Sequence, residues 1–167
     1  MDAKFVIDTN VGRLARWLRM MGYDALLFHE LDDGLMVKLA LAQGRTIVTK
    51  DTEFMKRRSI TSHKVRAVLV SGDDPELQML KVIAELQLDT RFNPFTRCLE
   101  CNAPLQARDR DGIKEEVPPR VYEKQYQYME CPVCRRLYWQ GTHWENMCRK
   151  LQEFESRRPQ FAEGDKR

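Results

Sequence analysis

The sequence predicts an α/β fold in which helices flank a parallel sheet, followed by a small module built around a metal ion. Strand-like and helix-like stretches alternate through residues 1–92, an order typical of right-handed crossovers between parallel strands. Beyond them, two Cys-x-x-Cys pairs are formed by Cys98, Cys101, Cys131 and Cys134. This spacing is typical of a zinc ribbon. We therefore expect an α/β domain over residues 1–92 and a ribbon with a closing helix over residues 93–155.

The strands and helices of the first domain follow from their apolar patterns. Short apolar runs predict strands at residues 4–8, 25–29, 46–49 and 66–70. Apolar residues at helical spacing predict helices at residues 11–22, 33–43 and 75–87. Gly44 fits the C′ position that ends the second helix, and Pro75 fits the first turn of the third.

The cysteine pairs predict a closed, tetrahedral site, which is structural rather than catalytic. The alternatives are two disulfides or four free thiols without a metal. The long separation between the pairs predicts an inserted hairpin, with its tip at the turn dipeptide Asp111-Gly112. Thr142 and Glu145 form a capping box that opens the closing helix, and Cys148 falls on the inward face of that helix.

Composition and charge narrow the class of protein. The 167 residues include no long apolar run, so we expect no transmembrane helix. The N-terminus lacks a signal-peptide pattern, and free thiols suit the cytoplasm, where we expect the protein. Residues 1–90 hold 13 basic and 13 acidic side chains, so the later residues supply the net charge of +3. Residues 156–167 are polar, and we expect a disordered tail there.

Several carboxylates follow the predicted strands. Because ligands bind beyond the carboxyl ends of parallel strands, we expect them at one edge of the sheet: Asp8, Asp32, Asp33, Asp51 and Glu53. Asp33 has the alternative role of a helix cap and Asp51 that of a turn residue, whereas Asp8 ends an apolar strand and needs a partner. Clustered carboxylates favour Mg²⁺ or Mn²⁺, and two such ions promote phosphodiester hydrolysis.

Basic and aromatic side chains indicate a nucleic-acid surface. Arg13, Arg16 and Arg19 recur every third residue opposite the apolar face of their helix, either to grip phosphates or as a solvated face. Arg135 and Arg136 follow the last cysteine of the second pair, where a phosphate contact is plausible.

The ribbon also carries residues with open roles. Tyr138, Trp139 and Trp144 lie near the second cysteine pair and belong to the ribbon core or stack on single-stranded RNA bases. His143 is an alternative zinc ligand, a substrate contact or a structural residue.

The run from Asp8 to Asp24 resembles the opening of the Mut-seven C-terminal RNase domain family. The resemblance continues through motifs at Asp33, Thr49-Lys50-Asp51, Arg97–Asn102, Val117-Pro118, Cys131–Cys134 and Tyr138–His143. It implies a PIN-like fold with a zinc ribbon and a metal-dependent ribonuclease whose acids are Asp8, Asp33 and Asp51. Asp8-Thr9-Asn10 is similar to the first motif of ordinary PIN nucleases, and we assign Asn10 to RNA binding.

One departure from that pattern leaves an alternative open. No residue matches the mid-domain glutamate of many PIN nucleases, although Glu53 or Asp32 can substitute. The first hypothesis is therefore a ribonuclease acting on RNA, which the aromatic residues of the ribbon indicate to be single-stranded, and the second is a non-catalytic RNA-binding or ribosome-associated module. A haloacid-dehalogenase-type phosphatase is disfavoured, because no second acid lies two residues after Asp8. The oligomeric state is left open.

Overall fold

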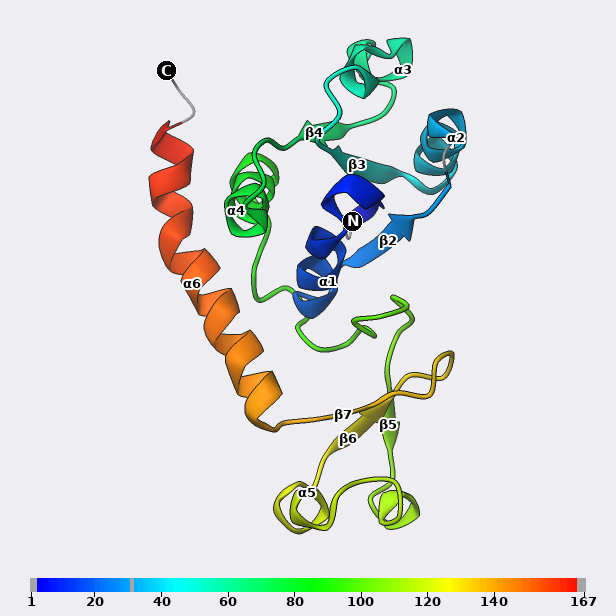
Figure 1. Cartoon of the computed structure of the whole chain (residues 1–167), viewed down its shortest axis with the longest axis vertical. Helices are drawn as coiled ribbons and strands as arrows, with labels where there is room; N and C mark the ends of the chain where they lie inside the picture. Colours follow the sequence, from blue (N-terminus) through cyan, green and yellow to red (C-terminus); the bar gives the residue numbers. More distant parts are fainter. Residues whose placement is uncertain (1–2, 31, 165–167) are drawn as a thin grey trace.

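The computed structural model describes residues 3–30 and 32–164, with side chains as far as residue 158. Within these residues, a four-stranded parallel sheet lies at one end of the molecule and a three-stranded antiparallel sheet at the other (Figure 1). A long C-terminal helix leads from the small sheet back along the large one (Figure 1). The α/β class predicted from the sequence is confirmed.

The large sheet has the strand order β2-β1-β3-β4, with all neighbours parallel. Its strands are β1 (Lys4–Asp8), β2 (Asp24–Phe28), β3 (Arg45–Thr49) and β4 (Ala67–Leu69). The connection after β1 runs to β2 at one edge of the sheet, and the connection after β3 runs to β4 at the other edge. The topological switch point therefore lies between β1 and β3. Ile7 pairs with Val48, and therefore the next residues, Asp8 and Thr49, reach the switch point together.

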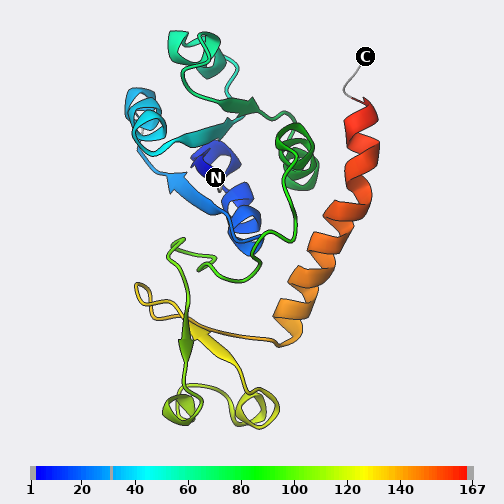
Figure 2. The ribbon, with the colours of Figure 1, turned by 180° about the vertical axis from the view of Figure 1, so that it is seen from behind.

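Helices cover both faces of the sheet (Figure 2). One face carries α1 (Arg13–Met20) and α4 (Pro75–Leu86), and the other carries α2 (Asp33–Gln43) and α3 (Arg58–Thr61). Short 3₁₀ turns, η1 (Thr9–Val11) and η2 (Phe54–Lys56), follow β1 and β3. Successive side chains of β1 point to opposite faces of the sheet, so this strand contributes to the core on each side. Phe5 and Ile7 pack in the core with α1 and α4, whereas Val6 packs with α2.

Helix ends match local sequence signals with one correction. The carboxylate of Asp32 accepts a hydrogen bond from Gly34 N at 2.7 Å and is the N-cap of α2. The alternative that Asp33 caps this helix is therefore wrong. Gly44 ends α2 in the left-handed conformation, as predicted.

The small sheet has the order β5-β6-β7, with strands β5 (Gln106–Arg108), β6 (Tyr128–Glu130) and β7 (Leu137–Trp139). The connection from β5 to β6 contains η3 (Asp111–Ile113) and α5 (Pro119–Lys124). The predicted hairpin tip at Asp111-Gly112 is wrong, because the connection folds back so that Ile113 and Val117 bury against Tyr128.

The last helix, α6 (Thr142–Gly164), begins at the predicted residue but extends much further than expected. Residues 156–164 are helical rather than disordered, and residues 165–167 lie outside the described part of the chain. Ion pairs join α6 to α4, since Arg157 contacts Glu76 at 3.3 Å and Lys150 contacts the same carboxylate at 2.5 Å. Among the described helices, none is long and apolar enough to cross a membrane.

The core of the large sheet includes residues from the second half of the chain. Leu99, Leu151 and Phe154 are buried in it, and the ring of Phe154 meets that of Trp17 edge-on at 5.1 Å. The predicted α/β domain over residues 1–92 therefore shares its core with residues from the second half of the chain. The boundary at residue 92 stays a prediction.

Candidate functional site

Asp8 ends β1 at the switch point, and its carboxylate is held by neighbouring donors. Asp8 Oδ2 accepts hydrogen bonds from Thr49 Oγ1 and Asn10 Nδ2, both at 2.7 Å. The backbone N–H of Asn10 donates to Asp8 Oδ1 at 3.4 Å. The prediction that Asp8 needs a partner is thus confirmed, because Thr49 and Asn10 donate hydrogen bonds to it.

Thr49 joins Asp8 to Asp51. Its side chain is buried, and its hydroxyl oxygen accepts a hydrogen bond from Asp51 N at 3.0 Å while it donates to Asp8. Asn10 adds a second link, because its Oδ1 accepts from Lys50 N at 3.4 Å. Sequence reasoning gave Thr49 no role, because the register that places it opposite Asp8 is not visible in the local sequence.

The other predicted acids have separate partners. Asp51 Oδ1 accepts hydrogen bonds from Glu53 N and Phe54 N at 2.8 and 3.1 Å, so Asp51 also shapes the turn after β3. Asp33 pairs with Arg57 at 2.7 Å. Glu53 pairs with Lys56 at 2.6 Å on the surface.

The carboxylates lie at the carboxyl edge of the sheet, but they do not form one compact set of ligands. Among the described residues, a single group of three or more His, Cys, Asp or Glu ligand atoms lies within 4.8 Å, and it consists of cysteines. Mg²⁺ nevertheless binds through one or two carboxylates together with waters and substrate phosphates. The oxygen donors of Asp8 and Asp51 fit that chemistry.

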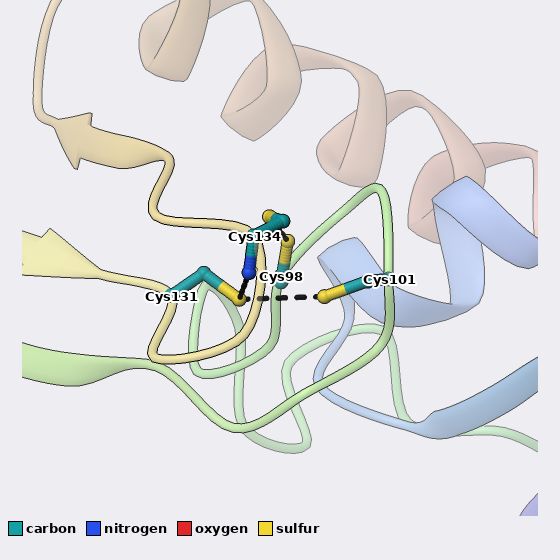
Figure 3. A group of neighbouring side chains, drawn as sticks. All are labelled: Cys98, Cys101, Cys131 and Cys134. Carbon is teal, nitrogen blue, oxygen red and sulfur yellow. Dashed lines mark hydrogen bonds between the residues drawn. The ribbon is translucent and has the colours of Figure 1, made fainter.

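The four cysteines converge from the two loops of the ribbon (Figure 3). The sulfur of Cys98 lies 3.5 Å from that of Cys134, and the sulfur of Cys101 lies 3.3 Å from that of Cys131. A disulfide bond is about 2.0 Å long, so these are free thiols. Zn–S bonds of 2.3 Å place tetrahedral sulfurs about 3.8 Å apart. The group can therefore hold a metal such as zinc.

The two cysteine loops repeat one backbone pattern. Cys98 N donates to Ala103 O at 2.8 Å and Asn102 N to Cys98 O at 3.0 Å. In the second loop, Cys131 N donates to Arg136 O and Arg135 N to Cys131 O, both at 2.9 Å. The residue after each pair, Asn102 or Arg135, has a positive φ.

Hydrogen bonds and burial distinguish Cys98 from Cys101. Burial opposes ionisation of Cys98, but donors that include the hydroxyl of Tyr138, 3.1 Å away, lower the pKa of this thiol to about 6. Burial raises the pKa of Cys101 to about 12. Because the hydroxyl of Tyr138 serves the cysteine site, the structure supports the ribbon-core role of this residue.

Residues 3–151 match the Mut7-C RNAse domain. The chain belongs to the Mut7-C RNAse domain family. Comparison with curated proteins and with solved structures gives no significant match. The matched part of this Mut7-C domain contains both the carboxylate edge and the four cysteines. Membership supports a nuclease-type function with RNA as substrate or partner.

The predicted arginine stripe of the Mut7-C domain needs correction at Arg19. This side chain is buried and donates to Ala25 O, Leu99 O and Glu100 O, each at 2.9 Å. Burial lowers the pKa of Arg19, against nearby anionic groups that raise it. Arg19 therefore fastens the first cysteine loop to α1 and does not present its charge to a phosphate, whereas Arg13 and Arg16 are exposed.

Asn102 makes a second junction between the first cysteine loop of the Mut7-C domain and the sheet. Its Oδ1 accepts from Ala25 N at 2.9 Å, and its Nδ2 donates to Asp24 Oδ1 at 2.7 Å. Asp24 also pairs with Arg45 at 2.7 Å. Sequence reasoning missed Asn102, although an asparagine after a Cys-x-x-Cys pair suits a left-handed position.

The basic residues of the ribbon differ in their exposure and in their ion pairs. Arg135 pairs with the buried Glu130 at 2.8 Å, and Arg108 also pairs with Glu130. Arg136 and His143 are exposed. His143 is not part of the cysteine group, which rules against its alternative role as a zinc ligand, and its Nε2 lies 3.4 Å from Arg16 Nη2.

Proposed function

We propose that the protein is a Mg²⁺- or Mn²⁺-dependent ribonuclease with a PIN-like fold, whose ribbon holds a structural zinc ion. The observation that carries this proposal is the link from Asp8 through Thr49 to Asp51 at the switch point of the sheet. Ligands bind at that point in open α/β sheets. Family membership supports RNA as the substrate.

The proposed site uses oxygen donors from three strand ends. Asp8, Asp51 and Asp33 would hold the ion, with Asp32 and Glu53 as further candidates near the same edge. The ion would supply Lewis-acid stabilisation of the phosphodiester and activation of water. Thr49 and Asn10 keep the carboxylate of Asp8 in one orientation, because both donate to its Oδ2.

The remaining predicted residues would position a single-stranded RNA. Arg13 and Arg16 project from α1, which begins shortly after Asp8, and Arg136 and His143 project from the ribbon and the start of α6. Phosphate contacts of this kind set position rather than sequence. Arg135 contributes less in this proposal, since Glu130 already pairs with it.

The test is Mn²⁺-dependent cleavage of single-stranded RNA by the zinc-loaded protein and by Asp8→Asn. We expect Asp8→Asn to lose at least about 100-fold in rate, by analogy with the loss of other essential charged groups, with unchanged zinc content. Asp109→Asn, an exposed aspartate of the ribbon, is the matched control and should cleave like the wild type. Equal rates for Asp8→Asn and wild type would remove Asp8 from the mechanism.

A second candidate function is a non-catalytic RNA-binding or ribosome-associated module. The observation that favours it is the pairing of Asp33 with Arg57 and of Glu53 with Lys56, which leaves fewer acids for an ion. RNA binding without turnover, unchanged by a mild chelator that leaves the ribbon zinc in place, would support this second function.

A further inference from the structure

A wide groove lies between the ribbon, the linker before it and the first turns of α6. Its volume is about 1060 Å³. Aromatic and basic side chains meet there, among them Phe95, Trp139, Trp144, Arg16, Arg136 and His143. The groove is separate from the carboxylate edge, and its aromatic walls include Trp139 and Trp144, for which the sequence left a core role and base stacking open.

The aromatic walls are fixed in place and partly open. Phe95 and Trp144 pack with ring centroids 5.3 Å apart, and both rings are half-buried. Phe95 has φ +61°, held by a hydrogen bond from its N–H to Met20 O at 3.2 Å. Such backbone strain is typical of functional positions. A Cβ at Gly141 would lie 2.9 Å from Trp139 Nε1, so the glycine leaves room for that indole.

Basic side chains of the groove come from segments far apart in sequence. Arg16 belongs to α1 and His143 to α6, and their side chains lie 3.4 Å apart. Glu100 offsets part of this charge by pairing with Arg16 at 2.8 Å. Arg136 and Arg97 also line the groove, so positive charge exceeds negative charge there. An occupant with both aromatic faces and negative charge is complementary to this lining.

We propose that the groove binds an unpaired segment of the RNA, away from the cleaved bond. The bases stack on the half-buried rings, and the phosphates contact Arg16, His143 and Arg136. The proposal rests on the ribonuclease function only for the position of the cut. Binding in the groove is a separate property of the chain.

Helix α1 connects the groove with the carboxylate edge. Arg13, in its first turn, is exposed and lies about 4.5 Å nearer to that edge along the helix axis than Arg16. A strand bound in the groove can therefore continue along α1 toward Asp8. This arrangement predicts a substrate class, namely RNA with an unpaired segment beside the cleaved bond.

The experiment uses the zinc-loaded, full-length Asp8→Asn protein without Mg²⁺ or Mn²⁺, so that binding is measured without turnover. Fluorescence anisotropy with a short labelled single-stranded RNA compares Arg136→Gln/His143→Ala with the control Arg120→Gln. Arg120 is exposed on α5 and does not line the groove. We expect the double variant to weaken binding about tenfold and to reduce the salt slope by about 0.7 for each lost phosphate contact.

Two further probes test the aromatic walls. An abasic RNA of the same length keeps the phosphates but loses the bases, and it should bind about tenfold more weakly or worse. A blunt RNA duplex should also bind more weakly than the single strand.

Three outcomes would overturn the proposal: unchanged binding by the groove variant, equal binding of abasic RNA, or tighter binding of the duplex. The first would leave the groove as a surface for a protein partner. Lack of cleavage by the wild type would overturn the ribonuclease proposal and leave this binding result intact.

Discussion

At the scale of single residues, uncharged neighbours orient Asp8 and Asp51, two acids of the proposed site. Asp8 would be an isolated carboxylate at a strand end if Thr49 and Asn10 did not donate to it. Thr49 has a double role, because its hydroxyl also accepts from the backbone of Asp51. Groups that orient metal ligands affect activity without touching the substrate.

Replacing Thr49 by valine keeps the side-chain shape and removes both hydrogen bonds. We expect a fall in Mn²⁺-dependent cleavage of about 10- to 100-fold and a loss of about 1–3 kcal/mol in unfolding free energy, since Asp51 N then lacks an acceptor. Cleavage kinetics and urea unfolding measure the two effects. Thr46→Val, on the same strand away from the site, is the control. Cleavage by Thr49→Val at the wild-type rate would show that the orientation of Asp8 is unimportant.

Gly22 is a residue whose lack of a side chain lets two segments cross. A Cβ at this position would lie 2.0 Å from Asn93 O, and φ is +94°. Gly22→Ala should therefore destabilise the protein by about 2–4 kcal/mol, because backbone atoms must move. Thermal unfolding tests this, with Gly112→Ala as control, since a Cβ there meets no atom within 4 Å. Equal melting temperatures for the two variants would contradict the close approach.

At the scale of elements, the first cysteine loop and the edge strand β2 form one unit. Burial opposes ionisation of Asp24, but hydrogen bonds from Arg45 and Asn102 lower its pKa below the ordinary value. A carboxylate with a lowered folded-state pKa stabilises the protein above its unfolded-state pKa of about 4. That contribution is lost as the pH falls through the folded-state value.

Asp24→Asn should therefore reduce the unfolding free energy by about 2 kcal/mol at neutral pH, and the difference from wild type should shrink below about pH 4. Denaturant unfolding across this range measures it. Asp109→Asn, on the ribbon surface, should show no such trend. A difference for Asp24→Asn that is the same at neutral and acid pH would contradict the assigned role of its charge.

The elements differ in how well sequence predicts them. The four strands and three large helices of the first domain follow from local patterns, and the structure confirms them. Arg19 looked like a phosphate ligand because its spacing follows Arg13 and Arg16, but the loop that buries it lies 80 residues further along the chain. In the helical extension, Arg157 pairs with Glu76 in α4, which lies 81 residues earlier in the chain. Long-range partners of this kind leave no local pattern.

The candidate site also has parts that the local sequence predicts and parts that depend on long-range contacts. The cysteine group was predictable because spacing alone brings the thiols of each pair together. The position of Asp8 at the carboxyl edge was predictable from its place after an apolar strand. Its partner Thr49 was not predicted, because that contact depends on the register between β1 and β3.

At the scale of the whole molecule, the ribbon and the sheet depend on each other. Arg19 and Asn102 join the first cysteine loop to α1 and β2, and α6 returns from the ribbon to pack on α4 (Figure 1). Loss of the metal should therefore loosen more than the ribbon, since metal binding and folding are coupled at such sites.

In the protein loaded with the proposed zinc ion, removal of that ion with a strong chelator should raise hydrogen exchange at Ala25, whose N–H donates to Asn102 Oδ1. We expect faster exchange there by at least about tenfold, while Val48 in the sheet interior stays protected. Cys148→Ser, outside the cysteine group, should keep the metal and the wild-type exchange pattern. Exchange that rises only in residues 98–139 would contradict the coupling.

Mn²⁺ binding tests most directly whether the carboxylate edge is the ion-binding centre of the protein. The free Mn²⁺ signal in electron paramagnetic resonance is titrated with the zinc-loaded wild type and with Asp8→Asn/Asp51→Asn. We predict that the wild type removes free Mn²⁺ from solution and that the double variant, still folded and zinc-loaded, does so at least about tenfold more weakly. Equal Mn²⁺ binding by the two proteins would contradict the account.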